Sequence, residues 1–526
     1  MGVATCRTIS LHGPVGHLVD VQVDVSPGAV GATLVGRADP SLQEARERCR
    51  MAITNSNLDW PSTRRTTILL SPADLAKRGT TFDLAIAVAV CAATGQLGDV
   101  DLGTTVLIGE LTLDGGLRCV PGVLPMALAA ADRGIERVMV PEPQAAEAAM
   151  VPGLTVFGVR SLAQAVAVLT GAEVPEAPPV ARVSGAPLLH GFTSPGRDHV
   201  DLADLDGLEQ AKFALEVAAA GGHHLLLNGP KGAGKTSLVE RLPGILPALT
   251  RAESLELTVL HSLAGTLQSS HGLIEEAPYF APHHAASAVA VLGGGTGRVR
   301  PGGVSLAHLG VLFLDELALF RTDVIDGLRE PLENGEITVA RGDEVATYPA
   351  RSIFVAAANP CPCGYAGIRG KEHLCRCDAP TVRHYTRRLR GPVLDRVDIQ
   401  ISVRPETAGS DGVSPPEPSA QVAERVARAR ARQHARYAGR AWHLNGHVPT
   451  PVLAREWPLG PQGRAMVEAE LRAGRLTRRG SGRVHRLAWT VADLAGHDEP
   501  HDADVQAALA LRQDQPLQAA VLGAGA

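Results

Sequence analysis

One segment constrains this chain more than any other: the run HHLLLNGPKGAGKTSLVERL, in which a glycine-rich loop joins an apolar stretch to a helix-forming stretch. We predict a strand over His223–Leu227 and an amphipathic helix after the loop. Between them, Gly229–Thr236 match G-x-x-x-x-G-K-[ST], a spacing that lets backbone N–H groups surround phosphate oxygens. A plain glycine-rich turn is the alternative. The predicted phosphate-binding residues are Gly229, Pro230, Lys231, Gly232, Ala233, Gly234, Lys235, Thr236 and Ser237.

Two of these residues, and two acids further along the chain, have predicted chemical roles. We expect Lys235 to reach the β- and γ-phosphates of ATP and Thr236 to give its hydroxyl to Mg²⁺. In HLGVLFLDELALF the apolar run Val311–Leu314 ends at Asp315 and Glu316. Because open α/β sheets bind ligands at the carboxyl ends of their strands, we predict that Asp315 holds Mg²⁺ and that Glu316 polarises the attacking water. In the alternative interpretation the two acids only cap the next helix.

Several motifs resemble those of a known family. GVLFLDEL, LREPLENGEITVAR, YPARSIFVAAANPCPCG and RGPVLDRVDI closely resemble the magnesium chelatase-like (ComM/YifB) family of AAA+ ATPases, and the resemblance runs from about Thr5 to Arg512. It implies an α/β multidomain fold with a Lon-protease-like N-terminal domain, an AAA+ core with a helix-2 insert and a helical C-terminal lid. The expected limits are 1–175 for the N-terminal domain, 176–198 for a linker, 199–405 for the core, 406–420 for a second linker, 421–515 for the lid and 516–526 for a tail.

The resemblance also implies roles for single residues. Asn359, at the end of RSIFVAAANP, fits the sensor-1 position that reads the γ-phosphate; its alternative is a turn residue before Pro360. Arg396 matches the arginine finger that reaches a neighbouring subunit, and Arg479 is the first choice for sensor 2, with Arg483 the second.

The N-terminal part resembles the Lon-like domain of the same family. The positions of the Lon serine and lysine hold Thr81 and Met126 here. Because a Met side chain cannot act as a base, we expect no peptidase activity and predict a docking or assembly module instead.

Four cysteines lie close together after Asn359: Cys361, Cys363, Cys375 and Cys377. Four thiolates suit a tetrahedral structural Zn²⁺, although C-x-C is tighter than the usual C-x₂-C spacing. Buried free thiols or a redox pair are the alternatives. The other four cysteines, Cys6, Cys49, Cys91 and Cys119, are scattered and are expected to be packed thiols.

Net charge argues against a general attraction to nucleic acid, since the chain carries a formal charge of -5. Local patches are possible: residues 421–490 contain fourteen Arg and four Glu, with no Lys or Asp. Arg425, Arg428, Arg432 and Arg436 follow a helical spacing and predict one positive face that could contact DNA phosphates. A solvated helix face is the alternative.

A β-hairpin is predicted over Gly335–Ala350, turning at Gly342-Asp343. In related ATPases the equivalent hairpin lines a central pore, which makes Arg341, Arg298 and Arg300 further candidates for phosphate contacts.

These features favour a DNA-translocating ATPase, and the resemblance suggests a homo-oligomeric, hexameric ring that drives branch migration of recombination intermediates. The alternative is a protein-remodelling or magnesium-chelatase-type ATPase that does not act on DNA. The start of the chain shows no secretory signal, and its most apolar run is too short to cross a bilayer, so a cytoplasmic protein with no membrane partner is expected.

Overall fold

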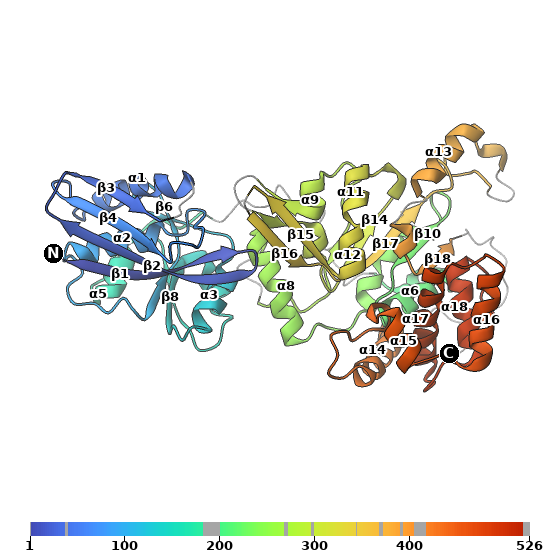
Figure 1. The fold of residues 1–526 in the computed structure, drawn as a ribbon. Coiled ribbons are helices and arrows are strands. Elements are labelled where there is room, and N and C mark those ends of the chain that lie inside the picture. The colour runs from blue at the N-terminus through green and yellow to red at the C-terminus, as the bar shows by residue number, and fades with distance from the viewer. Residues whose placement is uncertain are drawn as a thin grey trace.

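The computed structural model describes residues 2–36, 40–181, 200–267, 272–295, 299–342, 344–367, 372–389, 393–403 and 417–518. Figure 1 shows an N-terminal α/β unit beside a larger part that contains a second sheet and a helical C-terminal region. The predicted mixed α/β architecture is confirmed, whereas the exact domain limits remain predictions. No helix in the described ranges combines the length and apolar character needed to span a membrane.

The N-terminal unit is built on a seven-stranded mixed sheet of order β3-β4-β2-β1-β5-β8-β9. Alternate residues of β2, from Val19 to Val25, are buried, as expected for strands with one covered face. The strands are β1 Val3–His12, β2 Val15–Ser26, β3 Gly31–Val35, β4 Arg65–Ser71, β5 Thr105–Leu107, β8 Arg137–Pro141 and β9 Thr155–Val159, and the main helices are α1 Pro40–Asn55, α2 Asp83–Ala93, α3 Val123–Ala131 and α5 Leu162–Thr170.

The central sheet has five parallel strands in the order β11-β14-β17-β10-β18. Strands β14 and β17 are buried along their whole length, which explains their continuous apolar sequences. The residues predicted to bind nucleotide follow directly after three neighbouring strands in this order, β14, β17 and β10. The strands are β10 Leu225–Asn228, β11 Tyr279–Phe280, β14 Val311–Leu314, β17 Ile353–Ala358 and β18 Ile399–Ser402.

The start of β10 differs from the prediction, because the strand begins at Leu225 rather than His223. Helix α6 (Glu209–Gly221) ends just before it, with Gly222 at φ +69°. The His223 ring is fully buried, and its Nε2 lies 2.8 Å from Thr490 Oγ1. The backbone N–H of His223 donates to Ala218 O of α6 at 3.1 Å, so this residue belongs to the end of the helix rather than to the strand.

The region expected to hold the insert, between the predicted phosphate-binding loop and β14, contains several helices and a short ribbon. Helix α8 (Arg251–Ala264) is followed by α9 (Ala288–Leu292), the short ribbon β12–β13 (Gly293–Gly294 and Arg300–Pro301) and α10 (Gly303–Leu306). The predicted hairpin is confirmed as β15 (Glu336–Arg341) and β16 (Glu344–Pro349), with Arg341 opposite Glu344. Asp343 of its turn, and the candidate Arg298, lie outside the described residues.

The C-terminal region is helical, as predicted. Helices α14 and α17 pack on α6, and α18 packs on α17 and on β18. The helices are α14 Ser419–Arg436, α15 Thr450–Glu456, α16 Pro461–Arg472, α17 Arg478–Ala495 and α18 Asp502–Gln513.

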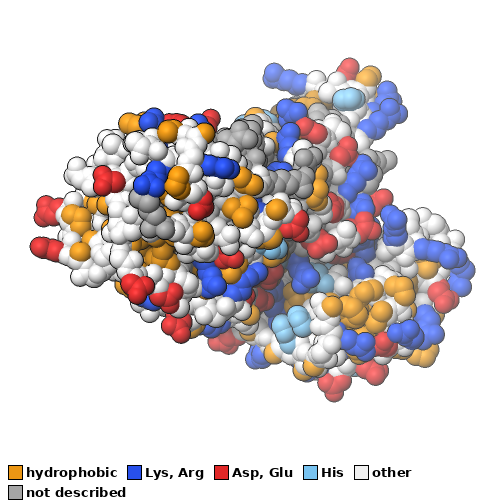
Figure 2. All heavy atoms as spheres, turned by 60° about the vertical axis from the view of Figure 1, so that its left-hand side comes forward, with side chains coloured by type: hydrophobic (Ala, Val, Ile, Leu, Met, Phe, Trp, Pro, Cys, Tyr) orange, Lys and Arg blue, Asp and Glu red, His pale blue; other side chains and the backbone are white. Residues whose placement is uncertain are grey.

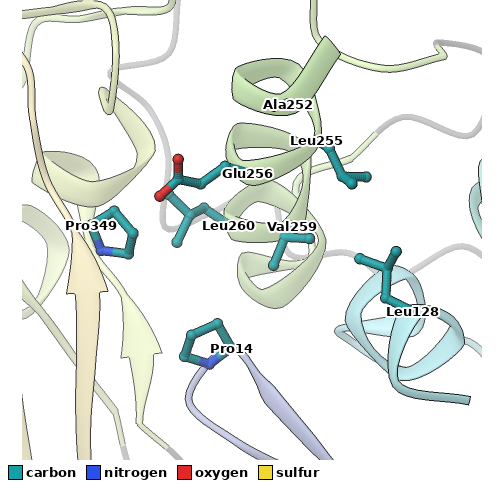
Figure 3. A pocket seen from close by; sticks show the side chains of 8 residues that line it. All are labelled: Pro14, Leu128, Ala252, Leu255, Glu256, Val259, Leu260 and Pro349. Carbon is teal, nitrogen blue, oxygen red and sulfur yellow. The ribbon is translucent and has the colours of Figure 1, made fainter. Parts of the chain in front are cut away.

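The N-terminal unit packs directly on the insert and the hairpin, and one hydrophobic core runs through both. Glu147 Oε1 accepts hydrogen bonds from Ser262 Oγ of α8 at 2.5 Å and from Leu124 N at 2.9 Å. Arg78 forms an ion pair with Glu344 of the hairpin at 3.1 Å. Beside these contacts lies a mostly apolar groove of about 320 Å³ between α8, α3 and the Pro14 turn (Figure 3). The groove contains none of the predicted nucleotide-binding residues.

Candidate nucleotide site

The predicted phosphate-binding loop leaves β10 and enters α7 (Lys235–Glu240). Gly232 and Gly234 take φ values of +75° and +83°, a left-handed region that side chains disfavour. These two glycines let the loop curl, so that the backbone N–H groups can converge on an anion. Helix α7 is short and is followed by the 3₁₀ turn Leu242–Ile245 rather than by further α-helix.

Lys235 is buried at the base of this loop. Its Nζ donates to the carbonyls of Gly229 and Pro230, both at 2.8 Å, and to Asn359 Oδ1 at 3.1 Å. Burial lowers the pKa of Lys235, and the charges of Asp315 and Glu316 act in the opposite direction. The ammonium is therefore aimed at the carboxyl edge of the sheet and faces two carboxylates.

Asp315 and Glu316 follow β14 at this edge. Thr236 Oγ1 donates to Asp315 Oδ2 at 3.0 Å, so a hydroxyl and a carboxylate, both hard oxygen ligands, lie side by side. That pair fits Mg²⁺, which prefers oxygen ligands and binds through few carboxylates. Glu316 has φ +52°, unusual for a residue with a side chain, and such strained positions often lie at functional sites.

Asn359 connects the lysine and the glutamate. It follows β17 directly, and its side chain is buried. Its Nδ2 donates to Glu316 Oε1 at 3.5 Å while its Oδ1 accepts from Lys235. Glu316 also lies 3.5 Å from Lys231 Nζ, so two groups of the site orient its carboxylate. The structure thus brings together the residues predicted from three separate motifs.

Arg396 lies apart from these residues. It ends the 3₁₀ turn Leu394–Arg396, and its guanidinium pairs with Glu333 of α12 (Arg329–Asn334). Within one chain, therefore, the structure does not bring Arg396 to the phosphate-binding loop.

The two sensor-2 candidates differ in environment. Arg479 is exposed in the first turn of α17, with no side-chain partner among the described residues. Arg483 is largely buried; it pairs with Asp398 at 2.5 Å and donates to the Arg396 carbonyl at 2.8 Å. The second choice, Arg483, thus links the helical C-terminal region to the segment that carries Arg396.

Asp398 was missed by the sequence interpretation, although it stands two residues after Arg396 in LDRVDI. Burial would raise its pKa, but the hydrogen bond from His223 and the charge of Arg483 outweigh burial and hold the pKa well below its usual range. The sequence signal for Asp398 was an acid close to a candidate arginine finger. The partners of Asp398 could not be identified without the fold.

The four clustered cysteines are brought together. Cys361 Sγ lies 3.3 Å from Cys363 and 3.9 Å from Cys375, and Cys363 lies 3.6 Å from Cys375. With Cys377, all four sulfurs fall within 4.8 Å of one another. Sulfurs about 2.3 Å from a tetrahedral zinc ion are about 3.8 Å apart, so the donor set fits Zn²⁺. Cys6, Cys49 and Cys91 are buried and Cys119 is half-buried, as predicted for packed thiols.

The prediction of one positive face on α14 is wrong. Arg425 pairs with Glu216 of α6 and with Glu417, and Arg436 pairs with the buried Asp493. Arg432 pairs with Asp498 at 2.8 Å. Of the four arginines, only Arg428 is exposed without a side-chain partner among the described residues. Three of the four charges are therefore paired within the chain, and α14 does not present the continuous positive face that its spacing predicted.

The Lon-related positions lie in the interior of the N-terminal unit. Met126 is fully buried on α3, and Thr81 is buried just before α2. Of the hairpin candidates, Arg341 is exposed at the end of β15 and Arg300 is half-buried in β13.

Comparison with known proteins covers nearly the whole chain. Residues 201–410 match the family described as magnesium chelatase, subunit ChlI; residues 21–144 match subunit ChlI of Mg-chelatase; and residues 416–512 match the ChlI C-terminal family.

Individual proteins are similar over comparable lengths. An uncharacterized protein of Mycobacterium tuberculosis is 44% identical over 98% of this chain and 99% of its own length. Competence protein ComM of Haemophilus influenzae is 37% identical over 96% of this chain and 97% of its own length. The magnesium-chelatase 38 kDa subunit of Rhodobacter capsulatus is 27% identical over 29% of this chain and 48% of its own length.

Proposed function

Because the chain belongs to the magnesium chelatase-like AAA+ family that includes competence protein ComM, we propose that it is an ATP-hydrolysing motor that acts on DNA. One observation supports hydrolysis above all others. Lys235, the Thr236–Asp315 pair and the Glu316–Asn359 pair converge at one edge of a parallel sheet. Phosphoryl transfer to water requires a phosphate-binding cation, Mg²⁺ ligands and a group that orients the water, and these pairs would supply all three.

Each residue has a distinct role in this proposal. Lys235 and the loop N–H groups hold the phosphates, and Thr236 and Asp315 hold Mg²⁺. When bound, Mg²⁺ neutralises charge that develops on the phosphate oxygens. Glu316, oriented by Asn359, orients and polarises the attacking water. Asn359 also touches Lys235, which suits a residue that responds to the γ-phosphate.

The finer roles extend across subunits. In the proposed hexameric ring, Arg396 leaves its ion pair with Glu333 and contacts the γ-phosphate bound by the neighbouring chain. It thereby acts as the arginine finger of that neighbouring site. Exposed Arg479 is the proposed sensor 2, and Arg483 holds the lid against the core through Asp398.

DNA is the proposed substrate, and branch migration of recombination intermediates is the proposed reaction; similarity to a competence protein supports both. The proposal also locates the protein in the cytoplasm, where DNA and ATP are both found. A protein-remodelling or chelatase-type ATPase remains the alternative, since a magnesium-chelatase subunit shares 27% identity with part of the chain.

The remaining parts are assigned supporting roles. The N-terminal unit is proposed to be a Lon-like docking module without peptidase activity, because Met126 offers no base and is buried. The four-cysteine cluster is proposed to hold a structural Zn²⁺, which has four thiolates there and no open position for catalysis.

ATP turnover with and without single-stranded and branched DNA tests the proposed function. We expect Mg²⁺-dependent turnover that DNA stimulates, together with DNA binding that weakens as salt is raised. Turnover that DNA leaves unchanged, with no salt-dependent binding, would reject a DNA substrate and favour the alternative class.

The variant Glu316→Gln tests the assignment of the catalytic site. Its amide cannot polarise water as the carboxylate does, so we expect ATP binding to persist while turnover falls by at least about 100-fold. A matched change at an exposed acid away from the site, Glu468→Gln, should leave turnover at the wild-type rate. Undiminished turnover in Glu316→Gln would mean that another group activates the water.

A further inference from the structure

Helix α13 (Ala379–Leu389) and the cysteine loop before it form a part of the molecule that none of the roles above uses. We call the described residues between Cys361 and Leu389 the arm. Figure 1 shows α13 projecting beyond the rest of the ATPase core, past the end of β17. Figure 2 shows Lys or Arg and His side chains gathered on this projecting part, at the top of the view.

The arm is basic in an acidic protein. The described residues of the arm include four Arg and no Lys, against two acids, Glu372 and Asp378. Asp378 caps α13, because its Oδ1 accepts a hydrogen bond from Thr381 N at 3.0 Å. Local charge of this kind, against a formal net charge of -5, is a candidate electrostatic footprint for phosphates.

The arginines of the arm are available to a ligand. Arg376, Arg383 and Arg387 are exposed, and no acid among the described residues lies within ion-pair distance of them. Arg383 and Arg387 are four residues apart and so share one face of α13. Like charges at this spacing repel one another mildly, which an anionic partner would relieve.

The other face of α13 is anchored. Tyr385, between the two arginines in sequence and on the opposite side of the helix, is buried. Helix α13 packs on the 3₁₀ turn Leu317–Leu319, which begins immediately after Glu316. One face therefore supports the arm and the other carries exposed charge.

The base of the arm also touches the phosphate-binding loop. At Gly364 (φ +90°) a Cβ would lie 3.3 Å from Lys231 Cγ and 3.4 Å from Lys231 N, so the two loops are in close contact. The cysteine cluster lies in the same segment, with its four sulfurs within 4.8 Å of one another. Contacts at both Lys231 and the turn after Glu316 connect the arm to the nucleotide site.

We propose that the arginine face of α13 is a contact for the DNA phosphate backbone, and that DNA bound there is sensed at the nucleotide site through these two contacts. This inference rests on the proposed DNA substrate and names the surface that binds it. Guanidinium groups suit phosphate oxygens and would give affinity without sequence preference. Coupling between two sites is reciprocal, so DNA on the arm and nucleotide in the loop should each alter binding of the other.

The test compares equal charge reversals on two exposed helix surfaces. Arg387→Glu and the double variant Arg383→Glu/Arg387→Glu change α13, and Arg428→Glu is the matched control on α14. Affinity for a fluorescent branched DNA and a fluorescent single strand is measured by anisotropy at several salt concentrations. We expect the double variant to bind at least about tenfold more weakly and to lose about two units of the log–log salt slope. The control should stay within about twofold of wild type.

Further measurements separate the possible failures. If the double variant binds DNA as tightly as wild type, the proposed DNA contact on α13 is wrong, but the proposal of a DNA substrate stands. If wild type binds no DNA, both the proposed DNA substrate and the proposed DNA contact on α13 are rejected. Loss of the nucleotide-bound oligomer in the double variant, seen by size-exclusion chromatography, would show that α13 contacts a neighbouring subunit and would also overturn the proposal. Turnover with DNA divided by turnover without it should fall in the double variant only.

Discussion

Helices α13 and α14 are both rich in arginine, yet they use their guanidinium groups in opposite ways. On α14, Arg425, Arg432 and Arg436 pair with acids and attach the lid to itself and to α6. On α13, Arg383 and Arg387 are exposed and form no ion pair in the described structure, although Asp378 at the start of the helix interacts electrostatically with Arg383. A guanidinium that is paired with a carboxylate has few free N–H donors for a ligand. Arginine content therefore locates a candidate phosphate-binding surface only after the internal partners are known.

The largest expected effect comes from breaking the pairing on α14. Arg425→Ala would leave Glu216, which is 9% exposed, as a buried carboxylate without its partner. We expect the free energy of unfolding of the region around α6 and α14 to fall by about 3 kcal/mol. Chemical denaturation followed by circular dichroism measures this.

The matched change on the arm is Arg387→Ala, which removes an exposed group and should alter stability by less than about 0.5 kcal/mol. Equal losses in the two variants would contradict the division between structural and available arginines.

The second expected effect is a loss of stability at low pH. Acid protonates buried groups such as His224, whereas the arginines of α13 are already charged. Burial lowers the pKa of His224 to about 4, and the ring nitrogen Nδ1 accepts a hydrogen bond from Phe354 N at 3.2 Å. An unfolded histidine has a pKa near about 6.5, so between these values the unfolded state binds more protons. The free energy of unfolding should therefore fall as pH falls through this window, by about 2 kcal/mol for His224 at pH 5.

Denaturant unfolding at pH 7 and pH 5 checks the size and the source of this loss. The variant His224→Gln should lose less stability on acidification than wild type, since Gln does not titrate. An unchanged pH dependence in that variant would assign the effect to other groups. The guanidinium groups of α13 stay charged throughout, so their contribution to DNA binding should survive at pH 5.

The smallest expected effect concerns the base of the arm. Cys375→Ser removes one of four clustered thiols and should lower the zinc content from about one ion per chain toward zero, as mass spectrometry would show. With its loop loosened, the arm should bind DNA about threefold more weakly. Cys119→Ser, outside the cluster, is the control and should keep both properties. Full zinc content in Cys375→Ser would exclude this ligand set.

The geometry of the candidate nucleotide site was predictable because its parts are local. Lys235, Asp315 and Asn359 each follow an apolar run that had to be a strand, and parallel strands place their carboxyl ends together. The hairpin and the cysteine cluster were equally local. What failed depends on distant partners: Arg425 meets Glu216 across 209 residues, and Arg436 meets Asp493 across 57. No periodicity within a segment reports such neighbours.

The packing of the N-terminal unit on α8 has a practical consequence. Leu260 and Leu263 of α8 belong to a core shared with α3, and Ser262 supplies the hydrogen bond that Glu147 needs. A shortened chain beginning at residue 200 would present these leucines to water as part of an apolar patch and would tend to self-associate. The ATPase core should accordingly be studied with its first 181 residues in place, since their removal uncovers an interior surface.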